Sequence, residues 1–456
     1  MNVLAATPSA GDSWLSGALV VAAVLVGLLL AGPALRRHHP TAWWLLLGFP
    51  VAVVRVSRSW PALMAGCGLA KSRKAALTVV SGLVNQGAPP PEPRVPRRGG
   101  IRPTPYGFWF PVRLLPGQVP EDFVRAASAM AHDWRVHAVR VTTSMPGIVR
   151  VTATVLDPLR EPRLPRQRRA DRLLNVVVGV LEHGASWRMD LREVPHWLIV
   201  GATRSGKSTL INALVAGLAP QPVALVGIDC KGGMELSLYE RRLSALATDR
   251  KKAVRLLTAL LDLTSARMDL CRSAHVRNIW ALPEDERPVP VVVIVDEIAE
   301  LFLVANRDEK ELAQAAATGL VRLAQLGAAL GVHLVIAGQR VGSDLGPGVT
   351  ALRAQLGGRV CHRVTDSGTA EMALGDLNPD AVEAAQAIAP ELAGTAVLAS
   401  ADGWERARSH LVSAEDAEEI ATTYAHLTPH LAELIDAGCQ PAGGMTVRLE
   451  RIDPDA

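Results

Sequence analysis

Residues 200–209, VGATRSGKST, combine a glycine-rich loop with a lysine and hydroxyl side chains, and such an arrangement binds phosphate. The stretch fits the pattern GxxxxGK[ST]. Glycines in such a loop let backbone N–H groups point at the β- and γ-phosphates of a nucleotide, and the following helix presents its positive N-terminus. Lys207 would bridge the phosphates, and the Ser208 hydroxyl would bind Mg²⁺. The predicted nucleotide-binding residues are Gly201, Ala202, Thr203, Arg204, Ser205, Gly206, Lys207, Ser208 and Thr209.

A pair of carboxylates follows a second apolar run, VPVVVIVDEIAELF at residues 289–302. The run predicts a buried parallel strand that ends at Asp296 and Glu297, and α/β sheets hold their ligands at the carboxyl ends of strands. Asp296 suits the coordination of Mg²⁺, and Glu297 suits a base that orients the attacking water. Together with the glycine loop, the pair predicts hydrolysis of ATP with Mg²⁺ as cofactor.

The chain around these residues predicts the elements that position them. The apolar strand HWLIV precedes the glycine loop, and a helix over 208–217 follows it. A strand over 223–229 and a helix around 249–273 come before the carboxylates. The additional strand points to the RecA-like branch of the P-loop fold, whose members usually work as rings with ATP between subunits. We predict an α/β fold, with a RecA-like P-loop motor of mainly parallel sheet and flanking helices, preceded by a small α/β or α+β domain and an N-terminal membrane segment.

The N-terminal region predicts attachment to a membrane. Residues 14–35 contain no charged side chain, and a helix of this length would cross a hydrocarbon core of about 30 Å. A second apolar segment, 42–54, is short for a span and is followed by Arg55 and Arg58, so that one span and two spans are both consistent with the pattern. We assign residues 1–85 to an anchor in the plasma membrane, with the basic residues that follow and the motor in the cytoplasm.

Two regions separate the anchor from the motor. Residues 86–105 are rich in proline and arginine and predict an extended linker. Residues 106–175 alternate strand patterns with one helical pattern, which predicts a small α/β domain that ends in a basic segment. Residues 160–172 of that segment carry six arginines in thirteen positions. The segment is either a solvated linker or a contact to a phosphate backbone, in which case Arg166, Arg168 and Arg169 would bind DNA.

Three further stretches follow the glycine loop, namely VGIDCKGGMEL at 226–236, GVHLVIAGQR at 331–340 and LGGRVCHRVTDSGTAEMALGD at 356–376. With the loop and the carboxylate pair they resemble the FtsK/SpoIIIE family of membrane-anchored double-stranded DNA translocases. The resemblance extends over about 196–400 and is nearest in kind to transfer proteins of actinomycete plasmids and integrative elements. The matching positions are Asp229, Lys231, Glu235, Leu236, Gln339, Arg340, Arg359 and Asp366 to Thr369.

The resemblance implies catalytic roles beyond those of Lys207 and Glu297. Gln339 would sense the γ-phosphate, and Arg359 would stabilise charge at the site of a neighbouring subunit. Asp229 and Lys231 would form an ion pair beside the nucleotide. The role of Arg359 requires a ring of identical subunits, for which the family suggests a hexamer.

The resemblance also implies where the motor meets DNA. Arg340 and Arg353 would face the double-stranded DNA in the channel of the ring. The chain departs from its relatives at Ala328, where they carry an arginine. A contact to DNA or to another subunit is then missing or is replaced, with Arg322 as the substitute.

Residues 176–408 form the predicted motor and residues 409–456 an acidic helical tail. From residue 401 onward the chain carries four basic and eleven acidic side chains, which does not suit a module that reads DNA. Recognition of a DNA sequence would therefore need a separate partner protein.

We predict a membrane-anchored, ATP-driven translocase of double-stranded DNA that serves conjugal transfer of a plasmid or integrative element. The alternatives are a translocase for chromosome segregation at division, a coupling protein that feeds single strands to a secretion channel, a protein-export ATPase of the type VII kind, and an inactive scaffold. The five cysteines are widely spaced without a CxxC pair, which excludes a zinc-ribbon or disulfide-framework class.

Overall fold

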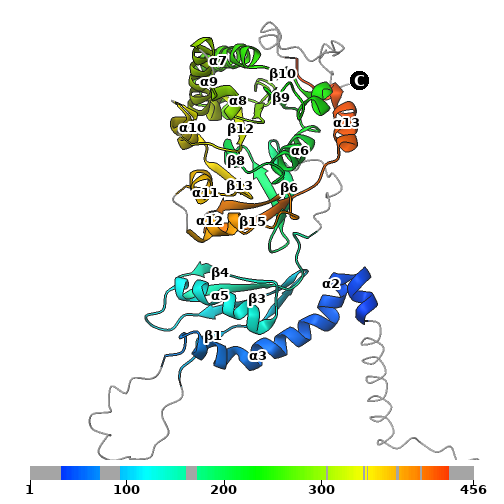
Figure 1. Cartoon of the computed structure of the whole chain (residues 1–456), viewed down its shortest axis with the longest axis vertical. Coiled ribbons are helices and arrows are strands. Elements are labelled where there is room, and N and C mark those ends of the chain that lie inside the picture. Colours follow the sequence, from blue (N-terminus) through cyan, green and yellow to red (C-terminus); the bar gives the residue numbers. More distant parts are fainter. Residues whose placement is uncertain are drawn as a thin grey trace, which may run out of the picture. The chain divides into compact units, whose positions relative to one another are not determined.

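The computed structural model describes residues 32–71, 93–160, 172–304, 307–342, 345–346, 348–375, 379–400 and 403–430. The chain divides into two compact units, residues 1–158 and 159–456, which we call the small unit and the large unit (Figure 1). Each contains one sheet. Most of the predicted membrane helix at 14–35 lies outside the described residues, as do Arg166, Arg168 and Arg169.

The small unit is an antiparallel sheet with helices on one face, so that the predicted small domain is of the α+β kind. Alternate residues of its third strand, Phe108, Phe110 and Val112, are buried in a core with helices α3 (Phe49–Gly66) and α5 (Pro120–Trp134). The strand order is β1–β3–β5–β4 with β2 beside β3. The strands are β1 (Arg97–Arg98), β2 (Arg102–Thr104), β3 (Gly107–Arg113), β4 (Ala138–Met145) and β5 (Ile148–Thr154).

The second apolar segment is longer than the predicted 42–54. Helix α2 (Pro40–Trp43), a π-helical turn (Trp44–Gly48) and α3 follow one another without a break. The helix passes the arginine that was expected to end the segment, because Arg55 donates to the carbonyl oxygen of Trp134 at 2.7 Å. By length and composition alone, residues 40–66 are a candidate membrane span.

One side of this helix belongs to the core of the small unit. Trp44 and Trp60 are buried, and their indole N–H groups donate to backbone carbonyls, that of Trp44 to Gly107 at 3.1 Å and that of Trp60 to Pro96 at 2.9 Å. Such pairing is expected of a buried indole. Other residues of the helix are exposed large apolar side chains, namely Leu45, Leu46, Val51 and Val54.

The large unit contains a ten-stranded sheet in the order β10–β9–β11–β12–β8–β13–β14–β15–β6–β7. From β10 to β13 neighbouring strands are parallel, and from β13 to β7 they are antiparallel. The parallel strands are β8 (His196–Val200), β9 (Ala224–Ile228), β10 (Ala245–Ala247), β11 (Val291–Val295), β12 (Val332–Gly338) and β13 (Gly358–His362). The antiparallel strands are β6 (Asn175–Leu181), β7 (Ser186–Asp190), β14 (Thr395–Ser400) and β15 (Gly403–Ser409).

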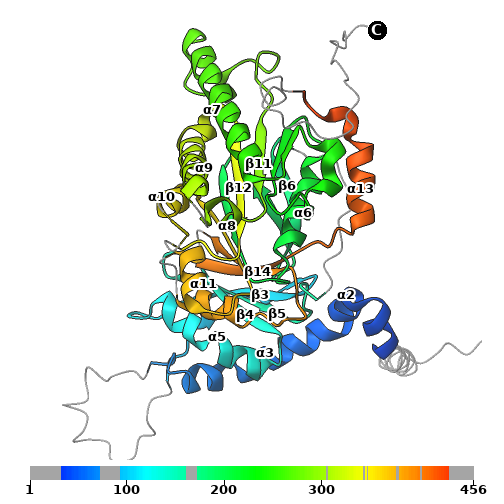
Figure 2. The same ribbon diagram turned by 45° about the horizontal axis from the view of Figure 1, so that its top comes forward.

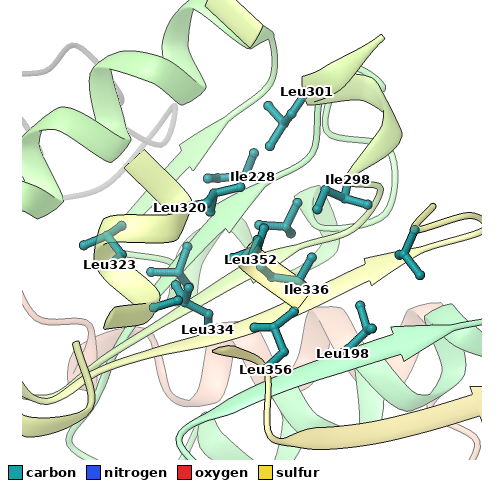
Figure 3. Close-up of a cluster of buried hydrophobic side chains, with 14 of the residues drawn as sticks. Leu198, Ile228, Ile298, Leu301, Leu320, Leu323, Leu334, Ile336, Leu352 and Leu356 are labelled. Carbon is teal, nitrogen blue, oxygen red and sulfur yellow. The ribbon is translucent and has the colours of Figure 1, made fainter. Parts of the chain in front are cut away.

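Helices cover both faces of the parallel part, as Figures 1 and 2 show. Helices α7 (Arg250–Ser273), α9 (Arg307–Leu326) and α10 (Val349–Gln355) pack on one face, where leucine and isoleucine side chains interdigitate with the strands (Figure 3). Helices α6 (Lys207–Leu218) and α13 (Ala414–Thr423) pack on the other. All five residues of β9 and of β11 are buried, as expected for strands with helices on both sides. The predicted α/β P-loop fold is confirmed.

The start of the acidic tail is integrated into this packing. Ser413 caps α13, since its hydroxyl accepts from the backbone N–H of Asp416 and the Asp416 carboxylate accepts from the backbone N–H of Ser413. Ala417 and Ala421 of α13 are buried in the same core as α6. Residues 431–456 of the predicted tail lie outside the described residues.

Candidate functional site

The predicted site residues follow four neighbouring strands of the large sheet. The glycine loop follows β8, Asp229 follows β9, Asp296 and Glu297 follow β11, and Gln339 follows β12. In the sheet these strands are adjacent and parallel, in the order β9–β11–β12–β8. The carboxyl end of each strand therefore delivers its polar residues to the same edge, where α/β folds place their ligands.

Two glycines allow the loop to close against its neighbours. Gly206 has φ +101°, and a Cβ atom there would overlap the backbone of Gly394. Gly201 is confined too, because a Cβ atom would lie 2.7 Å from Cβ of His362. The loop is further tied by a hydrogen bond of 3.0 Å from the N–H of Gly394 to the carbonyl oxygen of Ser205. This geometry leaves the loop backbone as the wall of a phosphate site at the start of α6.

The side chain of Glu297 is the centre of a network that joins three predicted residues. Its Oε2 atom accepts from Nζ of Lys207 at 3.0 Å, and Nζ of Lys231 lies 3.7 Å from the same atom. The backbone N–H of Gln339 donates to Oε1 at 3.1 Å. The hydroxyl of Thr203 in the glycine loop donates to the side-chain oxygen of Gln339 at 3.3 Å. The loop, the carboxylate pair and the glutamine thus form one connected site.

Asp296 is buried but incompletely satisfied. The residue has 2% of its surface exposed, and its Oδ1 atom has no hydrogen-bond partner. Burial raises the pKa of Asp296 to about 6, against the opposing charge of Lys207. An unpaired buried carboxylate oxygen suits a hard divalent cation, and the hydroxyl of Ser208 in the first turn of α6 offers a second oxygen ligand. Asp296 and Ser208 are the residues that would hold the ion.

The raised pKa of Asp296 predicts a pH-dependent gain in stability for Asp296→Asn in buffer without metal or nucleotide. The pKa of Asp296 lies at about 6 in the folded chain, against the ordinary aspartate value of 3.8. The loss of folding stability caused by the charged form is therefore absent below about pH 4, grows as the pH rises and is complete above about pH 6. Asparagine cannot ionise, so the variant should melt a few degrees higher at about pH 8 and at the same temperature at about pH 4. Calorimetry across this range measures the difference, and a pH-independent difference would contradict the prediction.

After β9, Asp229 and Lys231 do not form the predicted ion pair with each other. The carboxylate of Asp229 accepts backbone N–H groups of its own loop, from Lys231 at 3.2 Å and from Glu235 at 2.9 Å. Lys231 directs its ammonium group to Glu297 instead. Asp229 therefore shapes the loop, and the charge of Lys231 is added to that of Lys207 beside the carboxylate of Glu297.

Arg359 lies within β13, away from the carboxyl end of that strand. Its guanidinium donates to the carbonyl oxygens of Arg353 at 2.5 Å and of Ala373 at 3.4 Å. These carbonyls belong to α10 and to α11 (Ser367–Leu374), so Arg359 caps the ends of two helices. Burial and then the charge of Arg353 lower the pKa of Arg359. A role at a neighbouring subunit would require these hydrogen bonds to open.

The predicted DNA contacts in this unit lie beyond the carboxyl end of β12. Arg340 is exposed directly after Gln339. Arg353 lies on α10, where its guanidinium donates to the carbonyl oxygen of Val341 at 3.3 Å. Ala328 is part of a 3₁₀ turn before β12, and Arg322 is exposed on α9.

Sequence reasoning missed the contributions of Gly394 and His362. Gly394 comes before β14, more than 180 residues after the loop that it contacts. His362 is completely buried at the end of β13, with Nδ1 3.0 Å from the carbonyl oxygen of Thr395, and burial lowers its pKa to about 4. A neutral histidine thus packs behind the glycine loop. His362 lies in the stretch 356–376 but at none of its matching positions, and Gly394 lies outside the three stretches, so only the structure reveals their contact with the loop.

Comparison with known proteins agrees with this geometry. Residues 159–343 match the FtsK/SpoIIIE family, and residues 29–155 match the actinomycete conjugal transfer protein N-terminal domain. The transfer protein TraSA of Streptomyces ambofaciens is 41% identical over 401 residues, which cover 85% of this chain and 95% of that protein. The chain belongs to the FtsK/SpoIIIE family. Within it, the match to TraSA extends through both units.

Two further matches define how far the likeness reaches. The DNA translocase FtsK of Oceanobacillus iheyensis is 35% identical over 214 residues, 41% of this chain but only 26% of that protein. The solved structure of the conjugation coupling protein TcpA of pCW3, in its monomer form with ATPγS, has a TM-score of 0.55 and 20% identity and covers 73% of this chain and 94% of its own. At that identity the structure supports the fold alone. The FtsK/SpoIIIE match supports a P-loop ATPase.

Proposed function

We propose that this chain is an ATP-driven translocase of double-stranded DNA that serves conjugal transfer of a mobile element. The observation that carries the proposal is the connected site at the sheet edge, in which Lys207, Glu297 and Gln339 share hydrogen bonds. Such a site can bind a nucleoside triphosphate and hydrolyse it. The substrate of the motion is inferred from the names of its relatives, a transfer protein and a DNA translocase.

The hydrogen bonds of Glu297 suggest how hydrolysis begins. In the structure, Lys207 pairs with Glu297 at 3.0 Å. A γ-phosphate bound in the loop would compete for the same ammonium group, because phosphate binds the P-loop lysine. Glu297 would then keep its bond to the N–H of Gln339 and have one oxygen available to orient a water molecule. The proposed catalytic residues are therefore Lys207, Glu297 and Gln339.

Mg²⁺ is the proposed cofactor, held by Ser208 and Asp296. When bound, it would neutralise charge that develops on the phosphate oxygens. Arg359 is proposed to act at the nucleotide site of a neighbouring subunit in a ring. To do so it would have to release the carbonyl oxygens of Arg353 and Ala373. Arg340 and Arg353 remain the proposed DNA contacts of the ring.

The same proposal places the chain at the inner face of the plasma membrane. The helix over residues 40–66 is held to the small unit by Trp44 and Trp60, whose indole groups are hydrogen-bonded to its backbone. A helix fixed in this way has one apolar side left, which includes Leu45 and Val51. We propose that it lies along the membrane surface and does not cross it, as amphipathic helices do.

The test is ATP turnover of the full chain, reconstituted in lipid nanodiscs, with duplex DNA, with single strands and without nucleic acid. We expect duplex DNA to stimulate turnover and to be moved, as measured by displacement of a third strand annealed to the duplex. The Lys207→Ala variant supplies the background. Stimulation by single strands alone would favour a coupling protein for single-stranded DNA, and no response to either would overturn the proposal.

A further inference from the structure

The sheet of the small unit has one face that the helices leave open. Strand pairing assigns its residues, because directly paired residues of antiparallel strands point to the same side. Arg102 pairs with Trp109, and Arg97 pairs with Arg113. Phe108 and Phe110, which alternate with Trp109, are buried in the core with the helices, so Trp109 belongs to the opposite face.

This open face is strongly basic. The five strands contain no aspartate or glutamate. The register places five of their arginines on the open face, which we call the arginine face. Most of them are exposed. The arginines are Arg97, Arg102, Arg113, Arg140 and Arg150.

Trp109 fixes two of these arginines without using their hydrogen-bond donors. The guanidinium carbon of Arg150 lies 4.2 Å from the centre of the indole ring, and that of Arg102 lies 5.0 Å from it. These are cation–π contacts, which hold a guanidinium by its flat face. Within the described part of the chain, no hydrogen bond or ion pair engages Arg102 or Arg150. Their N–H groups are thus available and held in place.

The arrangement of the arginines is costly without a ligand. Arg97 and Arg113 are direct cross-strand partners, and like charges in this position destabilise a sheet. Neither arginine has an acidic partner among the described residues. A polyanion would convert this repulsion into attraction, because each bound phosphate releases counterions.

The size of the face also fits a nucleic acid. Strands β3 and β5 have seven residues each and extend for about 23 Å. Duplex DNA presents a phosphate about every 3.4 Å along each strand, hence about seven over this length. Threonines of the same face, Thr142 and Thr152, add neutral donors of the kind that bind phosphate oxygens. Contacts to phosphate oxygens carry no sequence information of their own.

We propose that the arginine face of the small unit binds the phosphate backbone of double-stranded DNA without sequence preference. The inference rests on the proposed function, because it takes duplex DNA as the substrate of the large unit. It adds a second DNA contact outside the P-loop fold. Such a contact keeps the duplex near the membrane while the ATPase unit releases and rebinds it.

The experiment compares two triple variants of the full chain in nanodiscs made of neutral lipid. R102Q/R113Q/R150Q removes three charges from the arginine face. R58Q/R125Q/R135Q removes three exposed charges from α3, α5 and the end of α5. Binding of a short duplex is measured by fluorescence anisotropy over a range of salt concentrations with a non-hydrolysable ATP analogue. Circular dichroism confirms that both variants fold.

For R102Q/R113Q/R150Q we expect at least tenfold weaker binding and a salt dependence whose slope falls by about 0.9 for each lost phosphate contact. Turnover without DNA should stay unchanged, and R58Q/R125Q/R135Q should bind as the unaltered chain does. Equal slopes for both variants would overturn the inference while leaving the proposed function intact. If the unaltered chain bound no duplex, the proposed function itself would fail.

Two other occupants of the face give distinguishable results. A loss of binding to vesicles of anionic lipid, with unchanged binding to duplex DNA, would assign the face to the membrane and overturn the inference. A change in turnover without DNA would indicate that the face docks onto an acidic surface of the large unit, which would also overturn it.

Discussion

Replacing Glu297 by glutamine should reduce ATP turnover by about 10²–10⁴-fold, the usual contribution of a general base. The glutamine oxygen can still accept from the backbone N–H of Gln339, so the local geometry is preserved. The charge that pairs with Lys207 and Lys231 is lost, together with the ability to draw a proton from water. Turnover under saturating ATP and duplex DNA measures the effect.

Nucleotide binding should respond in the opposite direction. In the unaltered chain Lys207 must leave Glu297 at 3.0 Å to reach a phosphate. Without the competing carboxylate, ATP should bind at least as tightly as before, which titration with a fluorescent analogue measures. The matched control is Glu300→Gln, one turn later in α8 (Ala299–Phe302), which should leave both quantities unchanged. Turnover of the Glu297 variant close to that of the unaltered chain would assign the base to another residue.

The two effects together separate catalysis from folding. A variant that merely loosened the site would lose nucleotide affinity and turnover in parallel. Retained or improved affinity with lost turnover indicates that Glu297 contributes to the reaction step and not to nucleotide binding, as expected of a residue that orients the attacking water. The hydrogen bonds around Glu297 therefore predict lost turnover together with retained nucleotide binding, which neither the sequence motif nor the fold predicts alone.

The nucleotide site was predictable from the sequence because its determinants are local. A glycine loop between a strand and a helix, and carboxylates at the end of an apolar run, are each contained in about ten residues. Adjacent parallel strands then bring these ends together, so the fold class determines the proximity of Lys207 and Glu297. The bond lengths and the pairing of Lys231 with Glu297 required the structure.

Features that depend on distant pairings were not predictable. Strands β6 and β15 pair although they lie more than 200 residues apart, and no periodicity in either indicates its partner. The apolar run at 42–54 predicted a part of the membrane anchor, and nothing in the sequence indicated that Trp44 and Trp60 would be buried in the small unit. Their burial against the small sheet depends on strands that follow later in the chain. Composition reports that a surface is apolar, and only the fold decides what covers it.

The arginine face is a charged surface that could not be predicted from the sequence either. Its arginines are spread over residues 97–150 and three of them, Arg113, Arg140 and Arg150, are isolated in sequence, whereas the basic run at 160–172 is conspicuous. Strand alternation and antiparallel register collect Arg102, Arg113 and Arg150 on one surface. A charge cluster of this kind is visible only when the register is known.

Replacing Gly206 by alanine should abolish nucleotide binding, with affinity reduced at least a hundredfold. The backbone of Gly206 has φ +101°, a conformation that costs a residue with a side chain about 1–3 kcal/mol. The added methyl group would also overlap the backbone of Gly394, which no rotamer change can relieve. Each 1.4 kcal/mol changes affinity tenfold. The steric overlap adds to the backbone strain, so we expect a loss of at least a hundredfold. Titration with a fluorescent ATP analogue measures the loss.

The control for the backbone strain is Gly147→Ala. Gly147 has φ +77° in the turn between β4 and β5, and a Cβ atom there would meet nothing within 4 Å. This variant should lose a little stability and keep full nucleotide affinity. If Gly206→Ala bound nucleotide as well as Gly147→Ala does, the loop would not need to close against Gly394. Binding would then depend on the side chains of Lys207 and Ser208 alone, and the approach of β14 to the loop would have no role in holding the phosphate.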